Sequence, residues 1–349
     1  MILGTRGSAL ALAQTELTLT ALRPAAPGEG FEVREIRTTG DKRQDLSLTH
    51  LAPGGHGYDA AATVDGSAAV SSPPLVGRVD PGLFTKELEA ELLAGRIDVA
   101  VHSLKDLPTA MPDGLVLAAV LPRADPADVL IWKDGDRDTT DLPVSVLPPL
   151  PLGAWIATSS LRRQRQLLHA RPDLRMCEIR GNVGTRLRKL YQHPDWAGTV
   201  LALAGLDRLG LRVDRQAGTL RTDEGLQFRA TVLGPEAMLP AVGQGVIGLQ
   251  TRADDVHTLR VLAAVNHAPT WNAVRAEREL LRLLGGGCQL PLGVTVERDA
   301  FHVERSLRAV LFSAEMVEPP LFAEVAWAGQ APEAVAAACA LALGVVTPS

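Results

Sequence analysis

Short strand-like segments alternate with helical ones near the start of the chain, and this order restricts the folds that it can adopt. Residues 2–4 form a strand candidate, Ser8 suits the N-cap of a helix, and residues 31–38 alternate apolar and charged side chains. A helical pattern over 83–94 and an apolar strand over 97–101 follow. Strand, helix and strand in succession predict an α/β domain.

The same alternation returns from residue 155, so a second α/β lobe is expected. Its segments are strands over 155–157, 176–179 and 199–204, the last closed by Gly205, and helices over 161–170 and 183–191. A chain of 349 residues is too long for one ordinary core. A helix over 273–284, strands from Leu292 onward and an Ala-rich helix over 332–343 predict a third, smaller unit.

Three stretches interrupt this pattern. Gly, Ala, Ser and Pro dominate residues 51–79, and a loop of that length inside a domain is functional or disordered, most often a lid or an insertion. Residues 134–151 and 216–225 are rich in Pro, Asp and Gly, so we expect them to be surface excursions.

The composition favours a reducing compartment. Hydrophobic residues make up 46% of the chain and charged residues 21%, the profile of a soluble globular protein. Cys177 and Cys339 lie outside any C-x-x-C or metal-binding spacing, so neither a zinc site nor a disulfide framework is indicated. The N-terminus lacks a charged leader followed by an apolar run, and no segment reaches the roughly 20 apolar residues of a membrane span. We therefore expect a cytoplasmic protein without a metal.

Basic residues gather in one segment of an acidic chain. The net charge of −5 argues against a general nucleic-acid binder, yet residues 159–189 hold nine Lys and Arg against Asp173 and Glu178. Residues 159–163 and 180–186 put arginines at strand-to-helix junctions, where helix N-termini favour anions and guanidinium groups bind carboxylate or phosphate. The alternative is a solvated basic face, which suits any single arginine better than it suits two such motifs.

Polar residues also follow the strand over 97–101. Open α/β sheets bind ligands at the carboxyl ends of their strands, where Lys105 and Asp106 come shortly before Pro108. Among arginines Asp106 stays ionised, and it can stabilise a cation or exchange a proton with an amine. The alternative is a helix cap or a salt bridge to Lys105. His102 is expected to be a packed, hydrogen-bonded residue without a catalytic role.

Cys288 follows three glycines, Gly285 to Gly287, directly after the helix over 273–284. Glycines carry no side chain that could shield the thiol and they allow positive φ, so we expect Cys288 on an exposed loop. A thiol displayed in this way can be a nucleophile or an attachment point. The alternative is a helix C-cap followed by a turn that contains cysteine.

Eight motifs, in one order along the chain, match a known family. They are T-R-G-S-A-L-A-L-A-Q (5–14), G-L-F-T-K-E-L-E (82–89), V-H-S-L-K-D-L-P (101–108), T-S-S-L-R-R-Q-R-Q-L (158–167), I-R-G-N-V-G-T-R-L-R-K-L (179–190), L-A-G-L-D-R-L-G-L (203–211), L-P-A-V-G-Q-G (239–245) and G-G-G-C-Q-L-P-L-G (285–293). The set resembles the hydroxymethylbilane synthase family, also called the porphobilinogen deaminases.

The resemblance implies a monomeric transferase of tetrapyrrole biosynthesis, the route to porphyrins and heme. Two α/β lobes resembling type II periplasmic binding proteins would span 1–122 with 241–264, and 126–238, and an α+β domain would span 267–349. A dipyrromethane cofactor would be joined through a thioether to Cys288. Four porphobilinogen molecules would be deaminated and added head to tail to this primer, and the linear hydroxymethylbilane would be released by hydrolysis.

The resemblance also implies roles for single residues. Asp106, with Lys105 beside it, would face pyrrole N–H groups and stabilise the azafulvene cation left when ammonia departs. Further cofactor contacts would come from Ser160, Arg162, Arg163, Arg180 and Arg186. Substrate contacts would come from Arg6, Ser8, Arg208, Lys86 and Gln244. Because each pyrrole carries an acetate and a propionate, a growing chain needs many arginines.

The sequence departs from the family pattern at several positions, and two other classes of protein remain as alternatives. The segment 51–79 is longer than the usual active-site loop, Pro81 stands where lysine is common, and Ala9 replaces a frequent proline. A non-catalytic, two-lobed anion-binding protein would need the arginines but neither Cys288 nor the Lys105-Asp106 pair. A nucleic-acid-binding protein would show a broader positive face and an affinity that falls steeply with salt.

Overall fold

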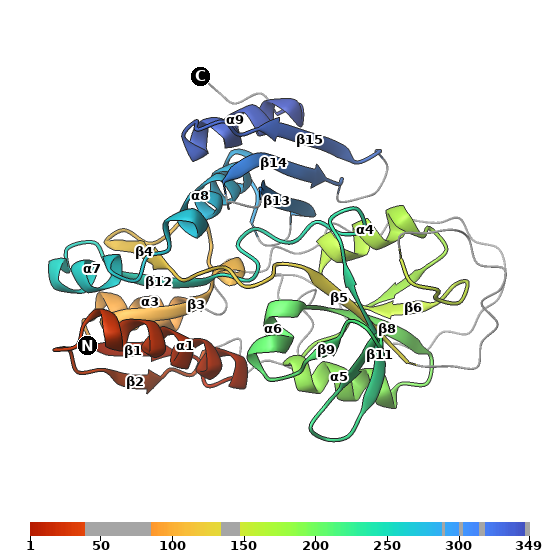
Figure 1. Ribbon diagram of the computed structural model, residues 1–349, viewed down its shortest axis with the longest axis horizontal. Coiled ribbons are helices and arrows are strands. Elements are labelled where there is room, and N and C mark those ends of the chain that lie inside the picture. Colours follow the sequence, from red (N-terminus) through yellow and green to blue (C-terminus); the bar gives the residue numbers. More distant parts are fainter. Residues whose placement is uncertain (39–84, 134–146, 288–289, 300–302, 314–317, 346–349) are drawn as a thin grey trace, which may run out of the picture.

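A computed structural model describes residues 1–38, 85–133, 147–287, 290–299, 303–313 and 318–345 of the chain (Figure 1). The loop expected over 51–79, Pro81, most of the excursion over 134–151, and Cys288 lie outside the described residues. Figure 1 shows two lobes side by side and a third, smaller unit packed against both.

The first lobe contains a sheet whose described strands run in the order β2-β1-β3-β12-β4. These strands are β1 (Ile2–Thr5), β2 (Glu32–Glu35), β3 (Val99–Ser103), β4 (Leu115–Val120) and β12 (Ile247–Arg252), and the helices are α1 (Ala9–Ala25), α3 (Lys86–Leu93) and α7 (Val256–Ala263). β1 is parallel to β2 and β3, whereas β12 is antiparallel to β3 and β4. Ser8 caps α1 as expected, because its hydroxyl accepts a hydrogen bond from the backbone N–H of Ala11 at 3.3 Å.

The second lobe contains a sheet with the strand order β7-β6-β8-β5-β11-β10-β9. Its described elements are β5 (Asp128–Trp132), β6 (Trp155–Ala157), α4 (Leu161–Ala170), β7 (Arg175–Cys177), α5 (Val183–Gln192), β8 (Trp196–Ala202), α6 (Leu203–Arg208), β9 (Val213–Asp214), β10 (Thr219–Arg221) and β11 (Gln227–Leu233). β6 is parallel to β7 and β8, and β5 is antiparallel to β8 and β11. Asn182 caps α5 by accepting a hydrogen bond from the N–H of Thr185 at 2.9 Å.

The two lobes share one plan. In each, the first strand of the βαβ unit lies between the second and the third, and an antiparallel strand lies on the other side of the third: β12 separates β3 from β4, and β5 separates β8 from β11. The chain passes from the first lobe to the second between β4 and β5 and returns between β11 and β12. Two α/β lobes resembling type II periplasmic binding proteins, as expected from the sequence, are therefore present.

The third unit is the smaller α+β domain that the sequence predicts. It consists of α8 (Ala268–Leu283), β13 (Leu292–Arg298), β14 (Glu304–Leu311), β15 (Leu321–Ala326) and α9 (Pro332–Ala342). The three strands form an antiparallel sheet in chain order. Side chains of α8, the sheet and α9, among them Leu280, Val294, Leu307 and Val335, pack into one hydrophobic core.

Three predictions of local structure need correction. The strand expected over 199–204 ends at Ala202, and Leu203 begins helix α6, which contains Gly205. Leu203 and Leu206 are buried, and a short apolar run does not distinguish a strand from a buried helix. The excursion expected over 216–225 lies at the surface, with most of its residues exposed, but it also contains β10, which pairs with β9 and β11 and whose Leu220 side chain is buried in the core of the second lobe.

The excursion expected over 134–151 is also wrong at its C-terminal end. Leu147 and Leu150 are buried in a core cluster of the second lobe with Ile156 and Leu167. Their burial removes apolar surface from water, so this end of the segment is part of the folded lobe.

None of the described helices is long and apolar enough to span a membrane.

Candidate active site

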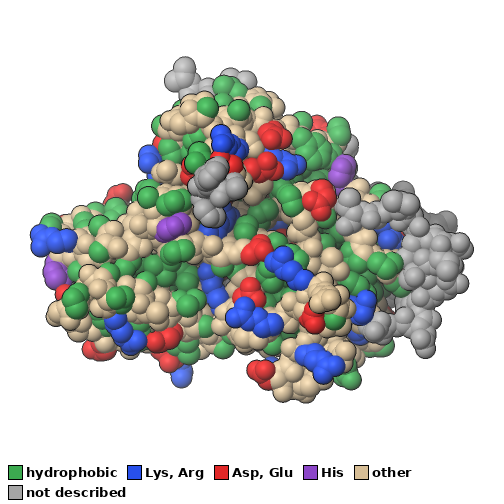
Figure 2. Space-filling view, viewed as in Figure 1, with side chains coloured by type: hydrophobic (Ala, Val, Ile, Leu, Met, Phe, Trp, Pro, Cys, Tyr) green, Lys and Arg blue, Asp and Glu red, His purple; other side chains and the backbone are tan. Residues whose placement is uncertain are grey.

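A cavity of about 210 Å³ lies where the two lobes meet the third domain. It is lined by residues 104–109 of the first lobe, by Ser160, Arg162 and Arg163 of the second lobe, by Ala241, Val242 and Gln244 of the returning segment, and by Arg278, Leu281, Gly287, Leu290 and Leu292 of the third domain. Gly287 and Leu290, the described residues on either side of Cys288 and Gln289, therefore border this cavity. Figure 2 shows Lys and Arg side chains on the visible face near the line between the lobes.

Asp106 lies at the meeting point of two cavities. It ends a 3₁₀ turn, Leu104–Asp106, that directly follows β3, and Leu107 is extended before Pro108 as the proline requires. Arg278 of α8 holds this turn, since its guanidinium donates to the carbonyls of Leu107 at 2.9 Å and Pro108 at 2.7 Å. Asp106 lines both the main cavity and a smaller one of about 70 Å³.

Lys105 lies beside Asp106 on the same turn. Burial lowers the pKa of Lys105 to about 8, although the neighbouring Asp106 carboxylate pulls it upward. Its ammonium group can therefore give up a proton near neutral pH. Such a perturbed pKa in a cavity is typical of a functional site.

The smaller cavity lies within the first lobe. It is lined by Arg6, Ser8, Leu10, Ala11, Gln14, Thr85, Val101, His102, Ser103 and Asp106. Gln14 fixes one wall, since its Nε2 donates to the Ser103 hydroxyl at 2.7 Å. The prediction that His102 is packed and hydrogen-bonded is confirmed: it is 5% exposed and its Nε2 is hydrogen-bonded to Gln250 Oε1 at 2.9 Å. Burial lowers the pKa of His102 to about 4, so its ring is neutral at pH 7.

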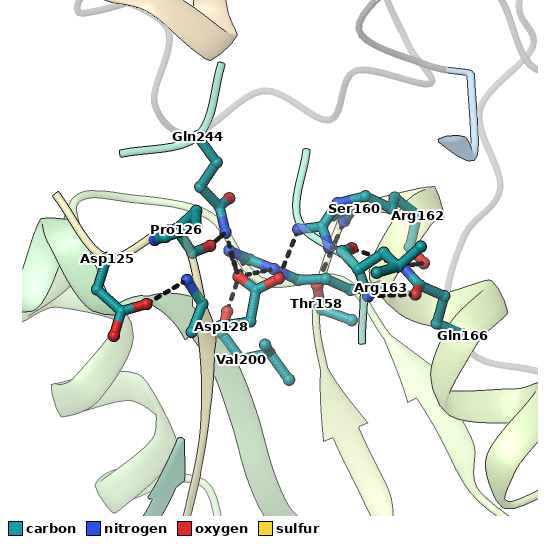
Figure 3. Close-up of polar contacts among 12 residues, drawn as sticks. Asp125, Pro126, Asp128, Thr158, Ser160, Arg162, Arg163, Gln166, Val200 and Gln244 are labelled. Atoms are coloured by element: carbon teal, nitrogen blue, oxygen red, sulfur yellow. Dashed lines mark hydrogen bonds and ion pairs between the residues drawn. The ribbon is translucent and has the colours of Figure 1, made fainter. Parts of the chain in front are cut away.

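Arg162 and Arg163 share one buried carboxylate, that of Asp128 (Figure 3). Arg163 donates to Asp128 Oδ1 through Nε at 3.1 Å and Nη2 at 2.7 Å, and Arg162 Nη2 lies 2.7 Å from Asp128 Oδ2. Burial alone would raise the pKa of Asp128, but the two guanidinium groups together lower it to about 2. Two cations against one anion leave an excess positive charge beside the cavity.

Asp128 is a site residue that the sequence reading missed. The acidic residue opens the apolar run Val129-Leu130-Ile131, and a charge at the start of a buried strand could have marked it. Ser160 is the N-cap residue of α4, and its side chain makes no capping hydrogen bond. The N-terminal end of α4 therefore keeps backbone donors available at the cavity.

The remaining predicted site residues line neither cavity; they are Arg180, Arg186, Arg208 and Lys86. Burial lowers the pKa of Arg186 to about 10, with Arg163 adding to the shift and Asp106 opposing it, so these charges act on one another. Arg180 lies 3.5 Å from Glu178, and Arg208 donates to the carbonyl of Gly245 at 2.6 Å. Lys86 is an exposed residue at the start of α3.

Gln244 connects the returning segment to the second lobe. Its Nε2 donates to the carbonyl of Pro126 at 2.6 Å and to Asp128 Oδ1 at 3.1 Å (Figure 3). Gln244 is 1% exposed and lines the main cavity. Within the described chain, two buried atoms of residues that line the main cavity, Gln244 Oε1 and Arg162 Nε, have no hydrogen-bond partner. A ligand that offers both carboxylates and N–H groups would satisfy both atoms.

These features define a class: a two-lobed protein with a third domain, in which Lys and Arg side chains gather around one carboxylate at a cavity where the three domains meet. Comparison with known proteins agrees. Residues 1–58 and 64–260 match the family model described as porphobilinogen deaminase, dipyromethane cofactor binding domain, and residues 271–343 match the porphobilinogen deaminase C-terminal domain.

Curated relatives point the same way. A porphobilinogen deaminase of Desulforudis audaxviator is 44% identical over 91% of this chain and 86% of its own length, and one of Shouchella clausii is 41% identical over 84% and 78%. Among solved structures, a periplasmic sulfonate-binding protein of Methylobacillus flagellatus is similar over 78% of this chain and 66% of its own, with 10% identity and a TM-score of 0.36. The fold class rests on the strand orders and not on this weak similarity.

The chain belongs to the porphobilinogen deaminase family. It is a transferase of tetrapyrrole biosynthesis, a hydroxymethylbilane synthase, and its cofactor is dipyrromethane. The described residues fit that group, because Lys105, Arg162 and Arg163 line the cavity next to the glycine loop, and because two of the lining residues each bury a polar atom without a hydrogen-bond partner.

Proposed function

We propose that Cys288 carries the dipyrromethane through a thioether and that Asp106 is the catalytic carboxylate. One observation supports both assignments: Asp106 and the residues that flank Cys288 border the same cavity at the junction of the three domains. When bound, the cofactor supplies the primer to which the first porphobilinogen is added. Ser160, Arg162, Arg163, Arg180 and Arg186 are proposed to hold carboxylates of the cofactor and the growing chain.

The smaller cavity is the proposed site of the incoming porphobilinogen. Arg6 and Ser8 there offer a guanidinium group and a hydroxyl to its acetate and propionate. Arg208, Lys86 and Gln244, which do not line this cavity, are proposed as further substrate contacts outside it. Asp106 opens onto this cavity and the main one, so a substrate ring on one side and a chain end on the other can both reach its carboxylate.

Asp106 acts on charge that develops in the substrate. When ammonia leaves porphobilinogen, positive charge appears on the pyrrole and its methylene group, and a fixed carboxylate nearby stabilises it. Lys105, whose pKa is about 8, can exchange a proton with the departing amine at neutral pH. Each of the four additions uses the same two side chains, and hydrolysis then releases hydroxymethylbilane.

The oligomeric state, compartment and domain bounds of the enzyme are proposed as well. We propose a monomer in the cytoplasm, with domains over 1–122 with 241–264, 126–238 and 267–349 and with no metal. Two features support it. The described cysteines, Cys177 and Cys339, are free thiols, and each of the three sheets closes within one of these units.

Mass spectrometry tests the cofactor assignment. Peptides of the purified enzyme that contain Cys288 should carry the added mass of a two-ring pyrrole, and Cys288→Ser should lack it. Cys177→Ser is the matched control, because burial raises the pKa of that thiol to about 11 and keeps it protonated. An active enzyme with an unmodified Cys288 would refute the assignment of Cys288 as the attachment point of the cofactor.

A further inference from the structure

We infer that Asp128 is a positioning residue for chain assembly: it holds Arg162 and Arg163 in the orientation in which they meet carboxylates in the main cavity. This inference rests on the function proposed above. Asp128 does not line the cavity, so it acts through the arginines that do.

The contacts of Asp128 are directional. Its side chain is fully buried, and Oδ1 accepts from Arg163 Nε, Arg163 Nη2 and Gln244 Nε2 at 3.1, 2.7 and 3.1 Å (Figure 3). Both bonds from Arg163 come from one guanidinium edge and converge on the same oxygen, which restricts the orientation of the guanidinium group as well as its position. Arg163 is held again by the carbonyl of Val200, to which Nη1 donates at 2.7 Å.

The two arginines are engaged differently. Asp128 occupies the Nε–Nη2 edge of Arg163, the edge with which a guanidinium group grips a carboxylate from the side. Arg162 meets Asp128 only through Nη2 and donates to the Leu239 carbonyl through Nη1 at 2.7 Å, while its Nε has no partner among the described residues. Arg162 therefore keeps one donor that no described residue uses, and Arg163 contributes charge from a fixed position.

Charge balance makes this arrangement depend on Asp128. Arg162 and Arg163 are 5% and 6% exposed, and two buried cations repel each other unless an anion lies between them. Without the carboxylate, the guanidinium groups would separate and leave the positions that the cavity needs.

Asp128 also ties the arginines to the third domain. The carbonyl of Gln244 accepts from Arg123 Nε at 2.9 Å, and Arg123 forms an ion pair with Glu277 of α8. Helix α8 leads into the glycine loop that precedes Cys288. The segment that contains Gln244 is thus hydrogen-bonded to Asp128, which orients the arginines, and it is linked through Arg123 to helix α8, which precedes the glycine loop.

The test compares Asp128→Asn with Asp173→Asn. Asp173 is a matched control, because it also pairs with a buried arginine of the second lobe, Arg171. The hydrogen bond from Arg171 lowers the pKa of Asp173 to about 2. Asp173 lines neither the main cavity nor the smaller one. For each variant we would measure thermal stability, the mass on Cys288, KM and kcat, and the number of rings added from limiting porphobilinogen.

We expect both variants to lose stability and only Asp128→Asn to change binding. Its KM for porphobilinogen should rise at least about tenfold, the loss expected when a charge-assisted contact to the ligand is misplaced, and its ring counts should stop short of wild type. Asp173→Asn should keep the wild-type KM and ring counts. A folded Asp128→Asn enzyme with both wild-type properties would overturn the inference.

Asp128→Glu keeps the test decisive if the asparagine variant fails to fold. Glutamate retains the charge that balances the two arginines but moves the carboxylate by one methylene group. A positioning role predicts a raised KM and shortened chains in this variant, and wild-type values would leave Asp128 with a purely structural role. Wild-type enzyme without the pyrrole mass on Cys288 would instead refute the cofactor assignment, and the KM comparison would still be readable.

Discussion

Replacing Glu277 with glutamine should strongly destabilise the protein. Glu277 is fully buried on α8, where it forms an ion pair with Arg123 and accepts a hydrogen bond from the N–H of Gly243 at 2.8 Å. Glutamine has the same shape but no charge, and its NH₂ group would face the donors of Arg123. The guanidinium group, whose side chain is 9% exposed, would then be a buried cation without its anion.

The expected cost follows from that burial. Removing one partner of a buried ion pair costs about 3–5 kcal/mol, because the remaining charge has lost its water and its counter-ion. The glutamine oxygen can keep the bond to Gly243, so we expect about 3 kcal/mol. The entropy of unfolding grows with chain length, to about 0.7 kcal/mol/K for 349 residues, so the melting temperature should fall by about 4 °C.

Glu333→Gln is the matched control. Glu333 of α9 pairs at 2.8 Å with Arg275, which lies on α8 as Glu277 does, but the side chains of Glu333 and Arg275 are exposed, 42% and 44%. Exposed pairs contribute about 0–1 kcal/mol. Calorimetric melts of both variants at neutral pH would give the comparison. Equal, small shifts would refute the reasoning that burial, and not ion pairing as such, makes the Glu277 contact important.

Three further outcomes are expected. Asp106→Asn should keep its fold and lose turnover by roughly two to three orders of magnitude, as measured by ammonia release from porphobilinogen, and near-normal release would contradict its role. Arg162→Lys and Arg180→Lys should each trap the enzyme with fewer added rings than wild type in mass spectra, because lysine lacks the two-pronged grip on a carboxylate. The pKa of Asp128, about 2 against an ordinary 3.8, means that its contribution to stability is complete above about pH 4 and is lost as the pH falls toward 2. That contribution is about 2 kcal/mol. The free energies of unfolding of wild type and Asp128→Asn, measured as a function of pH, should therefore converge as the pH falls from 4 toward 2. A difference in free energy that stays constant over this range would contradict the prediction.

Much of the fold could be predicted because local signals agree with the tertiary structure. Ser8 suits an N-cap and caps α1, and the helix expected over 161–170 and the strand over 155–157 have the observed bounds. The prediction failed at 199–204, where an apolar run carries no period that separates strand from helix.

The site was predictable only in part. Lys105, Asp106, Arg162 and Arg163 come together because each follows a strand that ends at the same junction. The buried carboxylate that the two arginines share belongs to a strand 35 residues earlier than Arg163. Nothing in the local sequence sets that distance. It is decided by the antiparallel insertion of β5 beside β8.

The inserted strand of the first lobe affects the order in which a growing chain can fold. β12 lies between β3 and β4, so those two strands have exposed edges until residues 247–252 have been made. At about 5–20 residues per second this interval lasts on the order of ten seconds. The second lobe, whose last described strand ends at Leu233, can complete its sheet earlier, although it comes later in the gene. During synthesis, the lobe with unpaired edges is therefore the first one, and it is the part of the nascent enzyme most exposed to mispairing.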